Sequence, residues 1–232
     1  MRRKGSVLLG SLALILGLLL YLWRTHVQTL HLFIGESTAQ ALKDNDRPIG
    51  ANRYDESPTI WPDNDLIGGT FQVSYGSGTN KILLPPARLV WMSQSAGVVY
   101  QLDISTSERK GTSAQIYKEL SELDDQFRAA GWQQTSALPD LPSIQQMLES
   151  SSGNTSTLAL AGYKEGNVEA SLQLSAPGAT LSPGSAAKAS FVARIVIQDR
   201  VLEIQQDDRM FAEREKVNGS SQNPLPLSHW VK

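Results

Sequence analysis

The feature that most constrains this chain is an apolar run close to its N-terminus. Residues 6–23 read SVLLGSLALILGLLLYLW, with no charged residue and 14 of 18 residues in the hydrophobic set. As a helix the run spans about 27 Å, close to the ~30 Å hydrocarbon core of a bilayer. A helix that is apolar on every side is typical of a membrane span, not of a surface helix. We therefore expect residues 6–23 to be a transmembrane anchor whose partner is the lipid bilayer.

The charges around this run predict its orientation. Residues 1–5 form a short basic segment that contains Arg2, Arg3 and Lys4. After the run, Arg24 is the only basic residue before Lys43. Basic residues accumulate on the cytoplasmic side of a membrane span, so we expect a cytoplasmic N-terminus and an extracytoplasmic remainder.

The end of the run carries two aromatic residues, Tyr21 and Trp23. Such residues are enriched where a span meets the membrane–water interface. A cleaved signal peptide is the alternative, but its apolar region is about 7–15 residues long and is followed closely by a small-residue cleavage site. Trp23 and Arg24 are poor flanks for cleavage, which favours an uncleaved, single-pass signal anchor.

Composition excludes several classes of protein. The chain has no cysteine, which rules out disulfide scaffolds, iron–sulfur clusters, cysteine-ligated zinc and thiol catalysis. Lys and Arg number 21 against 23 Asp and Glu, so no basic excess predicts nucleic-acid binding. Secreted animal domains often use disulfides, and a cysteine-free domain outside the membrane therefore favours a bacterial inner-membrane protein with a periplasmic domain.

After the anchor, the positions of turn-forming residues divide the chain into three parts. Residues 24–66 predict a juxtamembrane stalk and linker, because 24–43 have a partial apolar stripe and 44–69 are rich in Asp, Asn, Pro and Gly. Residues 67–206 predict the folded extracytoplasmic domain. Residues 207–232 predict a polar helix and a tail.

Within the folded part, alternating apolar residues predict strands. The expected strands are 71–75, 81–84, 89–94, 98–105, 158–163, 168–175 and 191–197. The pair Pro85–Pro86 is expected to end the second of these strands, and residues 164–167 to form a hairpin turn.

One helix is strongly indicated over residues 113–130. Its apolar residues are spaced four, three and four apart, which gives one stripe. Thr112 and Gln115 have capping-box spacing, and Gly131 stands where a helix-ending glycine belongs. A shorter helix is expected over residues 141–149, with Asp140 as its N-cap. The order predicts an α+β fold, an antiparallel sheet with one main helix packed on one face.

No catalytic, cofactor-binding or metal-ligating set stands out. The histidines lie outside the expected domain, at His26, His31 and His229. The runs Asp44–Asp46 and Asp63–Asp65 begin like calcium loops, but the second has Ser74 where the pattern needs Glu. Ser185 and Lys188 match S-x-x-K without its companion motifs. Asp124–Asp125 and Asp207–Asp208 are expected to be solvated.

The tryptophans after the anchor fall into two groups. Trp91 and Trp132 are expected in the core. Trp61 follows the β-branched Ile60, and Trp230 lies in an apolar tail broken by prolines. Either of these two is a candidate partner contact, although both are also able to fold back on their own domain.

These features together predict a non-enzymatic interaction module anchored in the membrane. It would be an accessory or assembly factor of an envelope complex, or an immunity protein, with a protein partner at the membrane surface. Tethering would raise the effective concentration of the module for its partner. The alternatives are an envelope hydrolase with two paired carboxylates and a small-ligand-binding domain.

Overall fold

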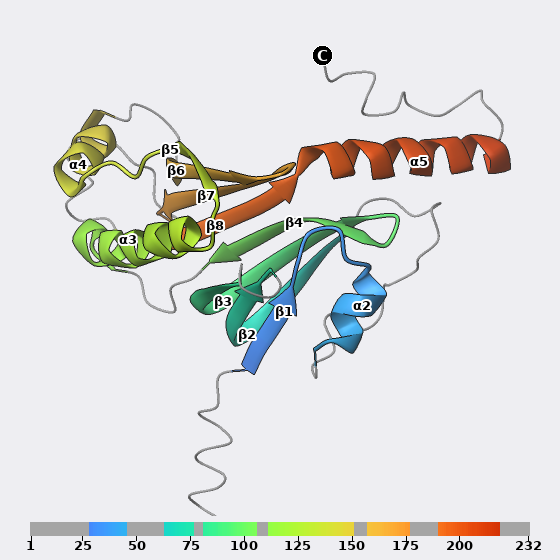
Figure 1. The fold of residues 1–232 in the computed structure, drawn as a ribbon, viewed down its shortest axis with the longest axis horizontal. Helices are drawn as coiled ribbons and strands as arrows, with labels where there is room; N and C mark the ends of the chain where they lie inside the picture. Colours follow the sequence, from blue (N-terminus) through green and yellow to red (C-terminus); the bar gives the residue numbers. More distant parts are fainter. Residues whose placement is uncertain are drawn as a thin grey trace, which may run out of the picture.

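A computed structural model describes residues 28–45, 63–76, 81–105, 111–150, 157–176 and 190–218; for 63–70 it describes the backbone only. These residues form one eight-stranded sheet with helices packed on it (Figure 1). The strand order is β1-β2-β3-β4-β8-β7-β6-β5. All neighbouring strands are antiparallel except β1 and β2, which are parallel. The fold is therefore α+β with a largely antiparallel sheet, as the sequence predicts at that level.

The elements follow the chain in two groups. The first group is β1 (Gln28–Leu32), α2 (Thr38–Lys43), β2 (Asp63–Tyr75), β3 (Ile82–Ser95), β4 (Val98–Ser105) and α3 (Ser113–Ala129). The second group is β5 (Gln133–Ser136), α4 (Leu141–Ser150), β6 (Thr157–Glu165), β7 (Val168–Ser175), β8 (Val192–Asp199) and α5 (Arg200–Asn218).

The two groups have the same order, strand-helix-strand-strand-strand-helix. Each contains a three-stranded meander, and the last strands of the two meanders, β4 and β8, pair at the centre of the sheet. The sequence shows no repeat of fixed period, so this duplication is visible only in the structure. It is incomplete, because β1 joins its neighbour in parallel while β5 joins in antiparallel.

Helix α3 forms as the sequence predicts and packs on the inner face of the sheet. Thr112 and Gln115 make the reciprocal capping box at its start, and Gly131 follows its end with φ +86°. Its apolar stripe enters the main core, against residues of β3, β7 and β8. The stripe consists of Ile116, Leu120, Leu123 and Phe127.

Other predicted features are also confirmed. Helix α4 begins with the backbone N–H of Ser143 donating to the Asp140 side chain at 2.9 Å. Trp132 is buried, and its ring meets Phe127 edge-on with 5.1 Å between centroids. Strands β4 and β7 have the predicted bounds.

Strand β3 corrects the prediction that Pro85–Pro86 ends a strand. The strand continues through both prolines for 14 residues. The pairing with β2 shifts register on both sides of this point, between Gly68 and Phe71 and between Gln72 and Ser74. A proline cannot donate to the ladder, and these irregularities accommodate the two residues that lack an N–H.

The segment expected to be a stalk contains part of the fold. Strand β1 pairs with β2, and its Leu30 and Leu32 are buried in the main core. Helix α2 begins with the Gln40 N–H donating to the Ser37 hydroxyl at 3.1 Å. Strand β2 starts at residue 63, so the folded part begins before residue 67 on both counts. A five-residue edge strand carries too little periodicity to be separated from a helical stripe by sequence alone.

The predicted anchor lies outside the described residues. Arg2, Arg3, Lys4, Tyr21 and Trp23 belong to the same undescribed segment. Within the part that is described, none of the helices is long and apolar enough to cross a membrane. The anchor, its orientation and the membrane location remain predictions from the sequence.

Candidate functional site: the outer face of the sheet

Strand β3 carries large apolar side chains on the face of the sheet that points away from the core. Leu83, Leu89 and Trp91 are 44%, 36% and 40% exposed. They alternate with buried residues such as Ile82, Leu84, Val90 and Met92, because successive side chains of a strand point to opposite faces. We call these three side chains the Trp91 surface.

Helix α5 covers one end of the same face. Ser93 and Ser95 follow Trp91 at alternate positions on β3, and both are buried. The Ser95 hydroxyl lies 3.6 Å from the sulfur of Met210 on α5. Met210 and Phe211 are buried but lie outside the main core. The Trp91 surface is therefore the continuation of a face that α5 partly occupies, and α3 lies on the opposite side of the sheet.

An ion pair lies beside the Trp91 surface at the centre of the sheet. Asp103 on β4 is the register partner of Trp91, and its carboxylate binds Arg194 on β8, with 2.7 Å between Nε and Oδ1. A second hydrogen bond joins Nη2 and Oδ2, so the pair is bidentate. The hydrogen bond to Asp103 raises the pKa of Arg194 above its usual value. This partly exposed pair gives the face a fixed polar border.

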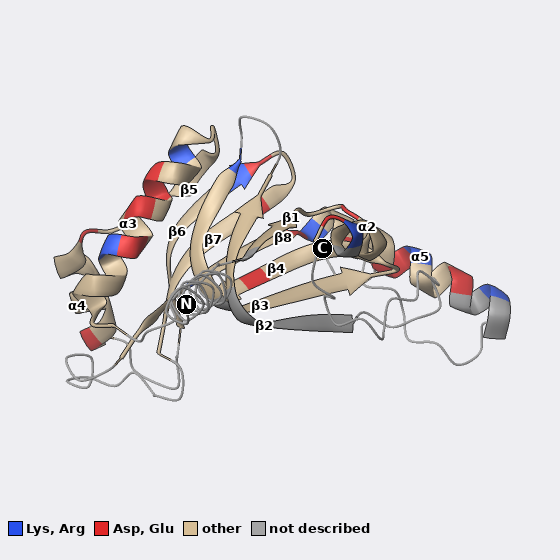
Figure 2. Ribbon diagram, turned by 90° about the horizontal axis from the view of Figure 1, so that it is seen from below, with Lys and Arg blue, Asp and Glu red and all other residues tan. Residues whose placement is uncertain are grey.

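The Trp91 surface is distinctive because most charged residues lie elsewhere, on the helices. Figure 2 shows acidic and basic residues concentrated on α3 and α5, while the strands are largely uncharged. Large apolar patches at a surface commonly mark interaction sites. Trp91 was expected in the core, and the structure corrects this: strand alternation predicts two faces but does not say which one the helices cover.

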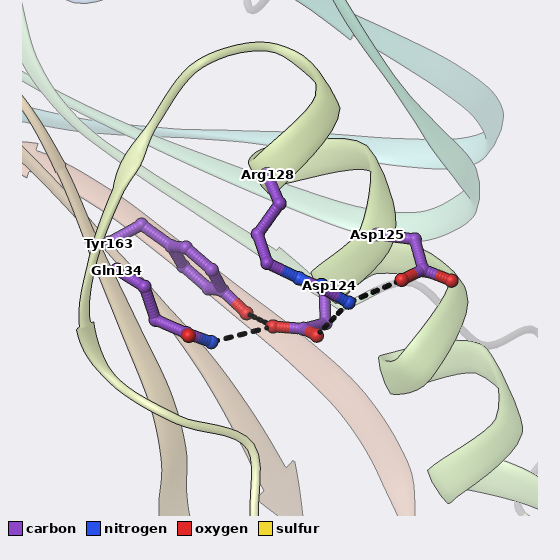
Figure 3. A network of polar contacts seen from close by, with 5 residues as sticks. All are labelled: Asp124, Asp125, Arg128, Gln134 and Tyr163. Carbon is purple, nitrogen blue, oxygen red and sulfur yellow. Dashed lines mark hydrogen bonds and ion pairs between the residues drawn. The ribbon is translucent and has the colours of Figure 1, made fainter.

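Helix α3 holds a second cluster, centred on Asp124 (Figure 3). The hydroxyl of Tyr163, on β6, donates to Asp124 Oδ1, and Gln134 Nε2 donates to the same oxygen at 3.0 Å. Arg128, one turn further along α3, lies 2.9 Å from the other oxygen and also contacts Asp125. Each carboxylate oxygen of Asp124 thus has a donor.

This cluster corrects the expectation that Asp124 and Asp125 are both solvated. Asp124 and Tyr163 are buried, whereas Asp125 is exposed. Burial raises the pKa of Tyr163, and the hydrogen bond to Asp124 raises it further. The Tyr163 ring also stacks on Phe127, with 4.6 Å between centroids. These contacts tie α3 to β6, so the cluster has a structural role.

The third group is Glu36, in the turn between β1 and α2. It is 3% exposed, and its Oε1 accepts a hydrogen bond of 2.7 Å from the Phe33 N–H. Its other carboxylate oxygen is buried without a partner. Burial raises the pKa of Glu36 to about 7, and the nearby charge of Asp44 adds to the rise. No pattern in the sequence predicts this group, because a single Glu beside a turn is ordinary.

Trp61 and Trp230, the predicted partner contacts, lie outside the described residues, as do His26 and His229. His31 is an exposed residue of β1. Among the residues with a described position, no three His, Asp or Glu side chains are grouped to hold a metal ion. The residues that the sequence predicts as membrane or partner contacts therefore all lie outside the described part of the chain.

Comparisons with protein-family models, with curated proteins and with solved structures find no match.

Proposed function

We propose that this chain is a non-enzymatic interaction module that contacts a protein partner through the Trp91 surface. Residues 6–23 would hold it in the inner membrane of a bacterium, with the folded part in the periplasm. In this role it serves as an accessory or assembly factor of an envelope complex, or as an immunity protein.

The observation that carries the proposal is the Trp91 surface itself. Three large apolar side chains stand exposed on one strand, and two of them, Leu89 and Trp91, lie beside the bidentate pair of Asp103 and Arg194. An apolar centre that includes a tryptophan, bordered by fixed polar groups, is the composition of a protein–protein contact. A strand of a packed sheet also presents these side chains on a rigid support, so little conformational entropy is lost on binding.

Site-specific photo-crosslinking in intact cells tests the proposal. A photoreactive amino acid replaces Trp91 in one variant and Gln145, an exposed residue of α4, in the control. We expect one protein partner to be captured from position 91 and not from position 145. The variant Trp91→Asp should lower recovery of that partner at least tenfold while the urea midpoint stays unchanged. Equal capture from both positions, or none, contradicts the proposal.

Glu36 favours one second candidate, a hydrolase with paired carboxylates. A general acid needs a carboxyl whose pKa is raised toward neutrality, and Glu36 has one, with Asp44 close enough to contribute. Against this role, Glu36 is almost fully buried, and its carboxylate accepts a hydrogen bond from the Phe33 N–H. If the chain hydrolyses envelope glycans, Glu36→Gln should abolish the activity; a partner captured through Trp91 from cells that carry this variant supports the interaction module instead.

A further inference from the structure

The tail that follows α5 has an unusual composition. Residues 219–232 read GSSQNPLPLSHWVK, and no Asp, Glu, Lys or Arg occurs before the final lysine. Segments that stay in solvent are poor in apolar and aromatic residues and rich in charge. Here two leucines, a valine and Trp230 fall within the last eight residues. This composition favours a segment that is covered by a surface.

Helix α5, which leads into the tail, packs on the same side of the sheet as the Trp91 surface. The contact between Ser95 and Met210 fixes α5 on the outer face, and the helix continues to Asn218. Figure 1 shows α5 extending beyond the strands that it crosses. The tail therefore starts beyond the sheet, on the side of its outer face.

The tail is long enough to return to that surface. From Met210 to Asn218 the helix advances about 12 Å, and from Ser95 back to Trp91 the strand covers about 13 Å. Six extended residues, 219–224, span at most about 20 Å, and twelve, 219–230, about 40 Å. By this path Trp91 is about 25 Å and Leu89 about 32 Å from Asn218, so Leu227 and Trp230 are within reach of Trp91, and Trp230 also reaches Leu89.

We propose that residues 224–231 pack on the part of the Trp91 surface formed by Leu89 and Trp91, in the same chain. Pro224 and Pro226 restrict the backbone to extended conformations, so less entropy is lost when the segment docks. A short tether gives an effective concentration of the order of millimolar, and a segment of weak intrinsic affinity is then mostly bound. The inference does not depend on the proposed function; where a partner uses the Trp91 surface, it competes with the tail.

Two other occupants of the surface are conceivable, the apolar run 6–23 and a second copy of the chain. The run 6–23 has the length of a bilayer span and enters the fold through β1, at the edge of the sheet. A second copy of the chain would contact the surface between molecules. The tail is preferred because α5, which leads into it, is held on the outer face by the contact of Met210 with Ser95, and because its apolar residues are within reach of Trp91.

Cysteine pairs provide the test, because the chain has no native cysteine to interfere. The variant Leu89→Cys with Val231→Cys is oxidised in membranes, next to a control with Glu149→Cys on α4 and Val231→Cys. We expect an intramolecular disulfide in the first, seen as faster migration without reductant, at a yield at least tenfold above the control. A disulfide-linked dimer identifies a second copy as the occupant, and no disulfide leaves the surface without the tail; both overturn the proposal.

Binding in trans gives a second measurement. A chain that ends at Asn218 should bind a synthetic peptide of residues 219–232, and the peptide with Trp230→Ala should bind at least tenfold more weakly. Leu89→Asp in the chain should cause a similar loss. Unchanged affinity in both variants overturns the proposal. Capture of a partner at Trp91 in cells is read separately, so failure of the tail and failure of the proposed function are distinguishable.

Discussion

Asp124 and Asp125 are adjacent in the sequence and contact the same arginine, yet their surroundings are opposite. Asp124 accepts hydrogen bonds from Tyr163 and Gln134 in a buried position, and Asp125 is exposed. Asp124→Ala should lower the free energy of unfolding by about 2–3 kcal/mol, because it leaves the buried Tyr163 hydroxyl without its acceptor. Urea unfolding measures this loss.

Asp125→Ala is the matched control for that change. It removes an exposed contact to Arg128, and exposed ion pairs contribute about 0–1 kcal/mol. Equal losses for the two variants would contradict this expectation. They would show that the contact with Arg128, which both aspartates make, accounts for the loss, and not the buried hydrogen bonds of Asp124.

The raised pKa of Glu36 determines the direction in which the stability of the fold changes with pH. Its value in the folded state is about 7 against 4.5 for the free group, so the fold favours the protonated form. The contribution of protonated Glu36 to the free energy of unfolding is complete below about pH 4.5 and is lost as the pH rises through 7. Glu36→Gln should therefore gain stability relative to the parent chain between pH 5 and pH 8.

Chemical unfolding at several pH values measures this gain. Glu122→Gln on the exposed side of α3 is the control and should follow the parent chain at every pH. A constant difference between Glu36→Gln and the parent would contradict the assignment.

At this scale the sequence predicts some residues and misses others for definable reasons. The cap residues Thr112, Asp140 and Gly131 are predictable, because caps depend on local geometry. Trp91 and Asp124 are not, because their exposure depends on which face α3 and α5 cover. The candidate site was missed for that reason alone.

Strand β1 is an edge strand whose outer side is closed by side chains. Asn45 accepts from the His31 N–H at 2.8 Å and donates to the His31 carbonyl at 2.9 Å and to the Ala41 carbonyl at 2.6 Å. Glu36 accepts from the Phe33 N–H. These contacts replace those that a further strand would make, which protects the edge from pairing with other chains.

Asn45→Ala should therefore weaken β1 more than a surface change would. We expect a loss of about 1–3 kcal/mol from buried hydrogen-bonding groups left without partners, and at least tenfold faster amide exchange at His31. Gln40→Ala on the exposed side of α2 should leave both quantities nearly unchanged. Slow exchange at His31 in Asn45→Ala would show that the edge is closed by something else.

The elements that are predicted well are those with a long regular pattern. Helix α3 and strand β7 have many residues of one periodicity, and their bounds agree closely with the prediction. The short strand β1 and the proline-containing strand β3 depend on pairing with β2, which lies elsewhere in the chain. Sequence periodicity carries no information about such partners.

For the whole molecule, the early start of the fold has a measurable consequence. Leu30 and Leu32 are buried in the main core, and burying a leucine is worth about 1.5–3 kcal/mol. Two such losses approach the ~5–15 kcal/mol that holds a typical domain together. A chain of residues 67–218 should therefore fail to unfold cooperatively in urea.

The control for this truncation is a chain of residues 28–218, which keeps β1 and α2 and should unfold in one cooperative transition. Cooperative unfolding of the shorter chain, at a similar midpoint, would show that β1 is dispensable.

The pairing of β4 with β8 sets the order in which the sheet is able to form. The ion pair between Asp103 and Arg194 joins residues 91 positions apart, and β8 is the last strand of the sheet. While the chain is synthesised from its N-terminus, each meander is able to form from neighbouring residues, but the two halves join only after Asp199 has emerged. Until then the edges of β4 and β7 that β8 later covers are open, so the growing chain is most vulnerable to misassociation just before its final strand arrives.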